Sequence, residues 1–236
     1  MLNNANAMEI DEIKNNDGVD AIMEIGFPGG YGFYGVADIL SGEANPSGHL
    51  TDTYAVTNAN SPAAQNFGNY EWTNADPSVN INAEEVEAED IYTGYKYYET
   101  RYADTVLGQG NADATVGSST GKAWNYDDEV SYPFGYGLSY TTFEQTLKSV
   151  DVDLANRTVT AEVDVKNTGD VAGKDVVQLY TSVPYTDYDV ENKVEKSAVQ
   201  LLDYEKNRYD RARRKPDCYN YSRCTGYGKL GQLLRE

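Results

Sequence analysis

The sequence predicts an α/β fold followed by an all-β sandwich. Residues 19–40 place an apolar run, a glycine-rich turn and a helical pattern one after another, which is one strand–helix unit of a parallel sheet. After residue 146 apolar and polar side chains alternate, which is typical of strands with one buried face. We therefore expect an α/β domain with long loop insertions over residues 1–145 and a sandwich of strands over residues 146–205.

The strand–helix unit is indicated by its lengths and its glycines. Residues 19–25 (VDAIMEI) are a short apolar run between two glycines, the setting of a buried parallel strand. Residues 26–32 (GFPGGYG) form the turn. Apolar side chains then recur at positions i, i+3, i+4 and i+7, which is the spacing of one helix face. These side chains are Phe33, Val36, Ala37 and Leu40. The Ser41-Gly42 pair is a typical helix end.

The rest of residues 1–145 is less regular. Residues 8–15 predict the end of a short helix, and residues 91–101 (IYTGYKYYETR) are compatible with another. Residues 55–89 and 103–128 are rich in Asn, Asp, Ala or Gly and predict long surface loops. We interpret an acidic cluster at the end of the first loop as a solvated face rather than a catalytic pair. Its members are Glu84, Glu85, Glu87, Glu89 and Asp90.

Residues 157–165 (RTVTAEVDV) contain the clearest strand pattern. Four apolar residues share one face of this segment, and polar residues share the other. The apolar positions are Val159, Ala161, Val163 and Val165. A turn at residues 167–170 (NTGD) leads to the next strand at residues 176–183 (VVQLYTSV). Strands at this spacing indicate a β-sandwich.

The last segment differs in composition from the rest. Residues 206–236 contain 9 of the 19 basic residues and 3 of the 38 acidic ones, so this segment carries a net charge of +6 and residues 1–205 carry −25. We interpret it as an aberrant basic tail, which a shifted reading frame or a wrongly assigned end after about residue 206 would produce. A genuine disordered tail and a nucleic-acid-binding arm stay open as alternatives.

Charge and composition argue against several classes of partner. A net charge of −19 disfavours nucleic acids and anionic membranes, because both attract basic surfaces. No apolar run approaches the ~18 residues that a membrane helix needs. The first residues lack the pattern of a signal peptide, and both a cytoplasmic and a secreted location stay open. Two cysteines, Cys218 and Cys224, with one histidine make a poor metal site, so no metal is expected.

Three segments, in this order, resemble the C-terminal part of glycoside hydrolase family 3, the β-glucosidase type. They are residues 26–50 (GFPGGYGFYGVADILSGEANPSGHL), 89–102 (EDIYTGYKYYETRY) and 130–143 (VSYPFGYGLSYTTF). Residues 165–180 (VKNTGDVAGKDVVQLY) resemble the fibronectin-type-III-like domain that follows in this family. The resemblance covers about residues 1–206. It implies a partial α/β sandwich domain followed by an incomplete fibronectin-III-like sandwich.

The resemblance implies a retaining hydrolase of terminal β-linked sugars that needs no cofactor. Such an enzyme uses two carboxyl groups, one as nucleophile and one as acid/base. In the family, the nucleophilic Asp lies on a barrel domain and the acid/base Glu on the α/β sandwich domain. The resemblance begins in the middle of that second domain, so we expect both catalytic carboxylates outside this chain and a truncated N-terminus. The missing barrel domain is then an expected partner, and the chain alone is expected to be inactive.

Tyr31 and Phe33 are the candidate substrate-binding residues. They follow the expected C-terminal edge of the parallel sheet, where open α/β folds bind ligands. The resemblance implies a β-linked oligosaccharide or an aryl or alkyl glucoside as substrate, and both rings would form the wall of its cleft. The alternative is that both rings pack the loop. A Ser-His-Asp triad is not favoured, because it would have to use His49, the single histidine, in a turn after the helix.

Two other functions stay open. The chain could be a non-catalytic module that binds carbohydrate or a protein partner, or one part of a split enzyme whose barrel comes from another chain. As a fragment of a hydrolase, the chain is expected to have unpaired sheet edges and uncovered apolar faces, which lower stability and favour aggregation. A non-catalytic module would instead fold cooperatively and bind saccharide without turnover.

Overall fold

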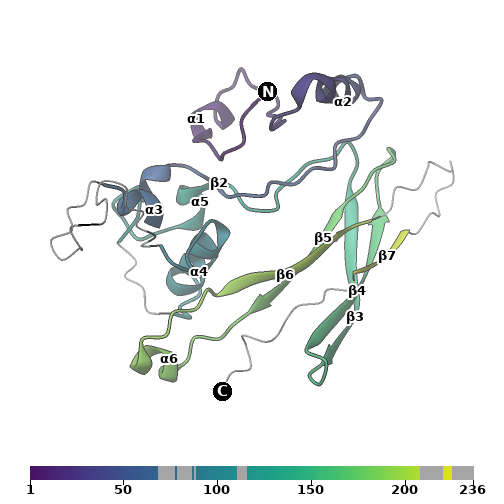
Figure 1. The fold of residues 1–236 in the computed structure, drawn as a ribbon. Coiled ribbons are helices and arrows are strands. Elements are labelled where there is room, and N and C mark those ends of the chain that lie inside the picture. The colour runs from purple at the N-terminus through teal and green to yellow at the C-terminus, as the bar shows by residue number, and fades with distance from the viewer. Residues whose placement is uncertain (69–77, 79–86, 88, 111–115, 208–219, 225–236) are drawn as a thin grey trace.

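A computed structural model describes residues 1–68, 78, 87, 89–110, 116–207 and 220–224. Helices and loops make up the N-terminal part, and antiparallel strands make up the C-terminal part (Figure 1). This mixture of helices and small antiparallel sheets fits the predicted α/β class. The predicted domain boundaries stay a prediction. None of the helices in these ranges is long and apolar enough to span a membrane.

The predicted parallel strand at residues 19–25 is wrong as a continuous strand. Its pairing within the described chain is one isolated parallel bridge between Leu2 and Glu24. The Leu2 amide donates to the Met23 carbonyl at 2.8 Å, and the Ile25 amide donates to the Leu2 carbonyl at 3.0 Å. A strand needs a neighbour along its whole length, and this segment finds one only at residue 2. The parallel direction was thus predicted correctly, and the extent was not.

The predicted helix is α2 (Gly29–Ser41), close to the short helix α1 (Asp11–Lys14) in Figure 1. Helix α2 begins four residues earlier than predicted, inside the expected turn, because Pro28 precedes it with a φ of −71° that suits a helix start. It ends where predicted, at Gly42, whose φ of 81° is in the left-handed region. On its predicted apolar face Val36 is buried, but Phe33 and Leu40 are 49% and 61% exposed.

The middle of the chain forms a core rich in tyrosine. It contains short elements around one longer helix: β1 (Tyr54–Ala55), η1 (Asn58–Asn60), α3 (Pro62–Gln65), α4 (Tyr95–Thr105), α5 (Tyr126–Glu129) and β2 (Val130–Tyr132). Strands β1 and β2 pair antiparallel. The buried residues of this core are Ala55, Tyr98, Trp124 and Val130, with Tyr97, Tyr102 and Tyr126 packed against them.

The helix expected within residues 91–101 is α4, displaced by a few residues because Gly94, with a φ of 54°, precedes it. The loop expected over residues 55–89 contains η1 and α3 in its first part. Glu84 and Glu85 of the acidic cluster lie outside the described residues.

The C-terminal part contains two antiparallel sheets. One has the order β3–β4–β7, formed by β3 (Phe143–Asp153), β4 (Thr158–Asn167) and β7 (Asn220–Cys224). The other is the hairpin of β5 (Val176–Ser182) and β6 (Val199–Lys206), with α6 (Asp187–Asn192) in its connection. Strand β7 lies within the predicted tail, most of which falls outside the described residues. The interpretation of the tail stays a prediction.

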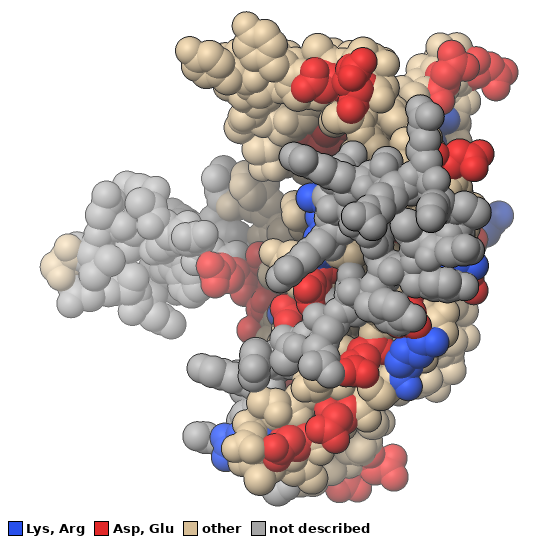
Figure 2. Space-filling model, turned by 90° about the vertical axis from the view of Figure 1, so that its right-hand side faces the viewer, with Lys and Arg blue, Asp and Glu red and all other residues tan. Residues whose placement is uncertain are grey.

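The predicted alternation in β4 is confirmed. Ala161, Val163 and Val165 are buried, and the polar residues between them are more exposed. Val163 and Val165 pack with Val177 of β5 and Phe143 of β3, so this cluster joins the two sheets. Much of β3 is exposed, including Leu147, Val150 and Val152. Acidic side chains are spread from top to bottom of the face shown in Figure 2.

The loop after α2 and the segment between β2 and β3, which belong to two of the glycine-containing motifs, run side by side. The Leu50 amide donates to the Tyr136 carbonyl at 2.8 Å, and the Gly135 amide donates to the Leu50 carbonyl at 2.8 Å. The approach is so close that a Cβ atom added to Gly137 would collide with the Gly48 carbonyl oxygen. Residue 137 must therefore be glycine for steric reasons.

We expect Gly137→Ala to lower the free energy of unfolding by about 1–3 kcal/mol, because backbone atoms must move to admit the methyl group. The matched control is Gly35→Ala in α2, where an added Cβ meets open space. That change should raise the free energy of unfolding by about 1 kcal/mol through helix propensity. Urea unfolding followed by circular dichroism measures both, and equal effects of the two substitutions would contradict this steric explanation.

Candidate functional site

Both predicted substrate-binding residues lie on α2, at the N-terminal end of the molecule (Figure 1). Tyr31 is 88% exposed, and Phe33 is about half exposed. The neighbouring side chains of Phe27 and Tyr34 are also exposed, and the four rings are called the α2 aromatic surface. With so little of its ring in contact with protein, Tyr31 does not serve mainly to pack the loop. The role of these rings in substrate binding stays a prediction.

A hollow of about 180 Å³ lies beside the end of the 19–25 segment and is called the Glu24 hollow. Its ionisable and hydroxyl-bearing lining residues are Glu24, His49, Thr51, Asp52 and Tyr54. Neither Tyr31 nor Phe33 lines it. Sequence reasoning missed Glu24 and Asp52, because a single acidic residue near a turn has no distinctive spacing. The one signal in the sequence concerned Glu24, which lies two positions before the glycine-rich segment.

The carboxylates of the Glu24 hollow are held in place by backbone amides. Glu24 accepts hydrogen bonds from the Gly26 amide at 2.8 Å and from the Tyr54 hydroxyl at 3.4 Å. Asp52 accepts one from the Thr53 amide at 2.8 Å. Burial, with the Glu24 carboxylate nearby, raises the pKa of the Tyr54 hydroxyl, which therefore stays a donor. The hollow can hydrogen-bond to hydroxyl groups, but no motif assigns either carboxylate a catalytic role.

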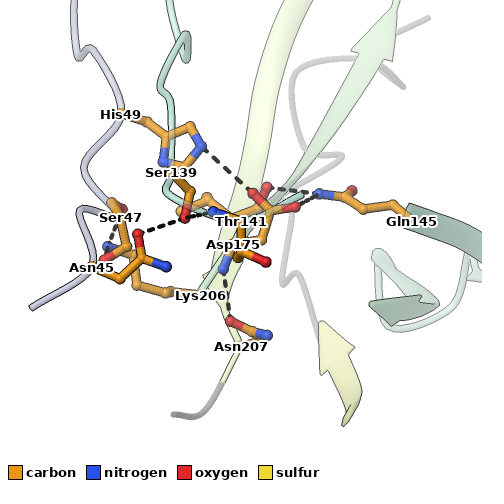
Figure 3. Close-up of polar contacts among 10 residues, drawn as sticks. Asn45, Ser47, His49, Ser139, Thr141, Gln145, Asp175, Lys206 and Asn207 are labelled. Atoms are coloured by element: carbon orange, nitrogen blue, oxygen red, sulfur yellow. Dashed lines mark hydrogen bonds and ion pairs between the residues drawn. The ribbon is translucent and has the colours of Figure 1, made fainter. Parts of the chain in front are cut away.

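A network of polar side chains, called the polar junction, connects the N-terminal part to the strands (Figure 3). Its residues come from the loop after α2, from the segment before β3, from β3 itself, and from both strands of the β5–β6 hairpin or their flanks. They are Asn45, Ser47, His49, Ser139, Thr141, Gln145, Asp175, Lys206 and Asn207.

Asn45 joins three separate segments within the polar junction. Its side-chain oxygen accepts hydrogen bonds from the Ser139 hydroxyl and the Tyr140 amide, each at 2.8 Å. Its side-chain nitrogen donates to the Ala172 carbonyl at 3.0 Å. One amide therefore connects three segments that lie about 30 to 130 positions apart in sequence.

The geometry around His49 does not form a Ser-His-Asp triad. Its Nε2 lies 3.7 Å from the Asp175 carboxylate, and its buried Nδ1 has no hydrogen-bond partner among the described residues. The nearby serines contact other groups: Ser139 donates to Asn45, and the Ser47 hydroxyl accepts from Lys206 at 3.2 Å. Within the described ranges, no group of three His, Cys, Asp or Glu side chains could hold a metal ion.

We expect Asn45→Ala to lower the free energy of unfolding by about 1–3 kcal/mol, because it leaves a hydroxyl, an amide and a carbonyl without their partner. Exchange of the Tyr140 amide hydrogen should accelerate, since that amide loses its acceptor. Exposed Asn3 is the matched control, and Asn3→Ala should change stability by less than about 0.5 kcal/mol. Unchanged Tyr140 exchange in Asn45→Ala would show that the junction does not depend on this side chain.

Comparison with known proteins gives the family. Residues 1–140 match the model of the glycosyl hydrolase family 3 C-terminal domain. β-Glucosidase BoGH3A of Bacteroides ovatus is 32% identical over 203 residues, covering 85% of this chain and 22% of that protein. β-Glucosidase A of Butyrivibrio fibrisolvens is 32% identical over 223 residues, covering 88% of this chain and 22% of that protein.

Solved structures give a similar result. A β-glucosidase from Paenibacillus barengoltzii matches with a TM-score of 0.68 and 28% identity, covering 98% of this chain and 20% of that one. A β-glucosidase from Kluyveromyces marxianus in complex with glucose matches with a TM-score of 0.56 and 27% identity, covering 85% of this chain and 18% of that one. The chain thus spans about a fifth of the length of these relatives. The resemblance noted in the sequence is confirmed, and the chain belongs to glycoside hydrolase family 3, with residues 1–140 matching its C-terminal domain.

Proposed function

We propose that this chain is part of a retaining β-glucosidase-like hydrolase that removes terminal β-linked sugars. The observation that carries the proposal is the family match over residues 1–140, supported by the likeness of almost the whole chain to a solved β-glucosidase. The substrate would be a β-linked oligosaccharide or an aryl or alkyl glucoside. No cofactor takes part in this chemistry, because two carboxyl groups perform the double displacement.

In this proposal the catalytic carboxylates lie on a segment other than this chain. The matched relatives are about five times longer, which leaves room for a barrel domain that supplies the nucleophile. An Asp there would attack the anomeric carbon, and a Glu would protonate the departing oxygen and later activate water. This chain would supply part of the cleft wall, with Tyr31 and Phe33 of the α2 aromatic surface stacking on the sugar.

The alternative is a module that binds carbohydrate without hydrolysing it. The exposure of all four rings of the α2 aromatic surface favours it, since exposed aromatic rings of this kind suit the apolar faces of sugars. The two functions differ in a single observable, which is turnover.

The purified chain should release no nitrophenol from p-nitrophenyl β-glucoside under conditions in which an equimolar complete family member gives full turnover. The reason is that the chain lacks an assignable nucleophile and acid/base pair. Circular dichroism and size-exclusion chromatography must first establish that the sample is folded and soluble. Release of nitrophenol that Glu24→Gln or Asp52→Asn abolishes would overturn the placement of the carboxylates and would make the Glu24 hollow the active site.

Replacing the residue aligned with Tyr31 by Ala in a complete family member should raise KM for the glucoside about fivefold, the loss of roughly 1 kcal/mol of aromatic contact. The control is the same change at the position aligned with Tyr34, which is also exposed but was not predicted to bind substrate. An unchanged KM at the Tyr31 position, or equal effects at both, would exclude a specific stacking role.

A further inference from the structure

A cleft of about 700 Å³ lies between α4 and the segments that connect β5, α6 and β6. Figure 1 shows α4 beside β6, with α6 at the far end of the hairpin. The cleft is within the range of roughly 300–1,000 Å³ that is usual for ligand pockets. It shares no lining residue with the Glu24 hollow or with the polar junction. We call it the α4 cleft.

One wall of the α4 cleft is a single face of a helix. Tyr97, Thr100, Arg101 and Asp104 line it, and their positions are i, i+3, i+4 and i+7 of α4. Arg101 is 7% exposed, donates to the Val116 carbonyl at 2.6 Å and lies 5.7 Å from the centre of the Trp124 ring. This side chain is therefore fixed in its orientation before any ligand arrives.

The opposite wall comes from residues 182–185 and 195–198, and direct hydrogen bonds hold it against α4. The Ala198 amide donates to the Thr100 hydroxyl at 2.9 Å, and the Leu201 amide donates to the Tyr95 hydroxyl at 2.9 Å. The width of the cleft is therefore fixed by bonds between the walls. Tyr185 supplies an aromatic ring on this wall.

Two cations and two carboxylates line the α4 cleft. Arg101 and Lys196 are cationic, and Asp104 and Glu195 are acidic. Lys196 also forms an ion pair with Asp189 at 2.6 Å, and this bond, with others from Thr186, lowers the pKa of Asp189 to about 2. Burial raises the pKa of Tyr92 to about 12, with the charge of Glu195 adding to it, so its hydroxyl stays neutral. With Asp189 counted, three carboxylates and two cations lie at the cleft, so the surroundings disfavour an anionic ligand.

We propose that the α4 cleft binds a neutral saccharide. The carboxylates of Asp104 and Glu195 would accept hydrogen bonds from sugar hydroxyls, and the guanidinium of Arg101 would donate to them. The rings of Tyr92, Tyr97 and Tyr185 would contact the apolar faces of the sugar. Binding of this kind involves no bond cleavage. The proposal rests on the proposed function only in taking β-linked sugars as the first probes.

The test is a calorimetric titration of the full chain with cellobiose, with glucuronate as the charged comparison. We expect saturable binding of cellobiose and weaker binding of glucuronate. Tyr185→Ala should weaken cellobiose binding by about fivefold or more, the loss of one aromatic contact. Glu195 is exposed, and Glu195→Gln is a conservative substitution. It should weaken cellobiose binding by a smaller factor and leave the melting temperature unchanged.

The matched control is Tyr204→Ala, because Tyr204 lies exposed on β6 and does not line the cleft. It should leave affinity unchanged. Absence of saturable binding by the folded chain, tighter binding of glucuronate, or equal losses in Tyr185→Ala and Tyr204→Ala would each overturn the proposal. Loss of binding in Tyr31→Ala alone would place the sugar on the α2 aromatic surface instead. None of these results depends on turnover, so the proposed hydrolase function stands or falls separately.

Discussion

The side-chain amide of Asn45 joins the two parts of this molecule. Its hydrogen bonds to Ser139, Tyr140 and Ala172 bring the loop after α2 against the start of β3 and the approach to β5. The neighbouring approach of Gly137 to the Gly48 carbonyl requires that residue 137 carry no side chain. Because one side chain joins three segments, a different arrangement of the two parts would break several hydrogen bonds at once.

The α4 cleft lies between the two parts that the Asn45 side chain joins. Its helix wall belongs to the part matched by the family domain, and its other wall belongs to the β5–β6 hairpin. The hairpin is held at one end by the polar junction, through Asp175 and Lys206, and further along by hydrogen bonds to Thr100 and Tyr95. Ligand pockets are common where two such parts meet, since each part contributes a rigid wall.

Local sequence patterns correctly predicted those elements that depend on interactions between residues close together in the chain. The end of α2 at Gly42 and the buried face of β4 follow from glycine chemistry and from the period of two. The strand predicted at residues 19–25 was too long, because apolar composition does not show whether a neighbouring strand is present along the whole segment. Phe33 and Leu40 have helical spacing, yet spacing alone does not show what covers a face.

Some residues of the candidate sites could be predicted from the sequence, and others could be found only in the structure. By itself the sequence determined the family, the two types of pattern along the chain, and the aromatic residues Tyr31 and Phe33 beside the glycine-rich segment. Only the tertiary structure decided that Glu24 and Asp52 line one hollow and that Arg101 and Asp104 line one cleft with Tyr185 and Glu195. The physical reason is distance along the chain. Residues that meet across some 30 to 100 positions share no period or motif, so their proximity arises only when the two parts pack together.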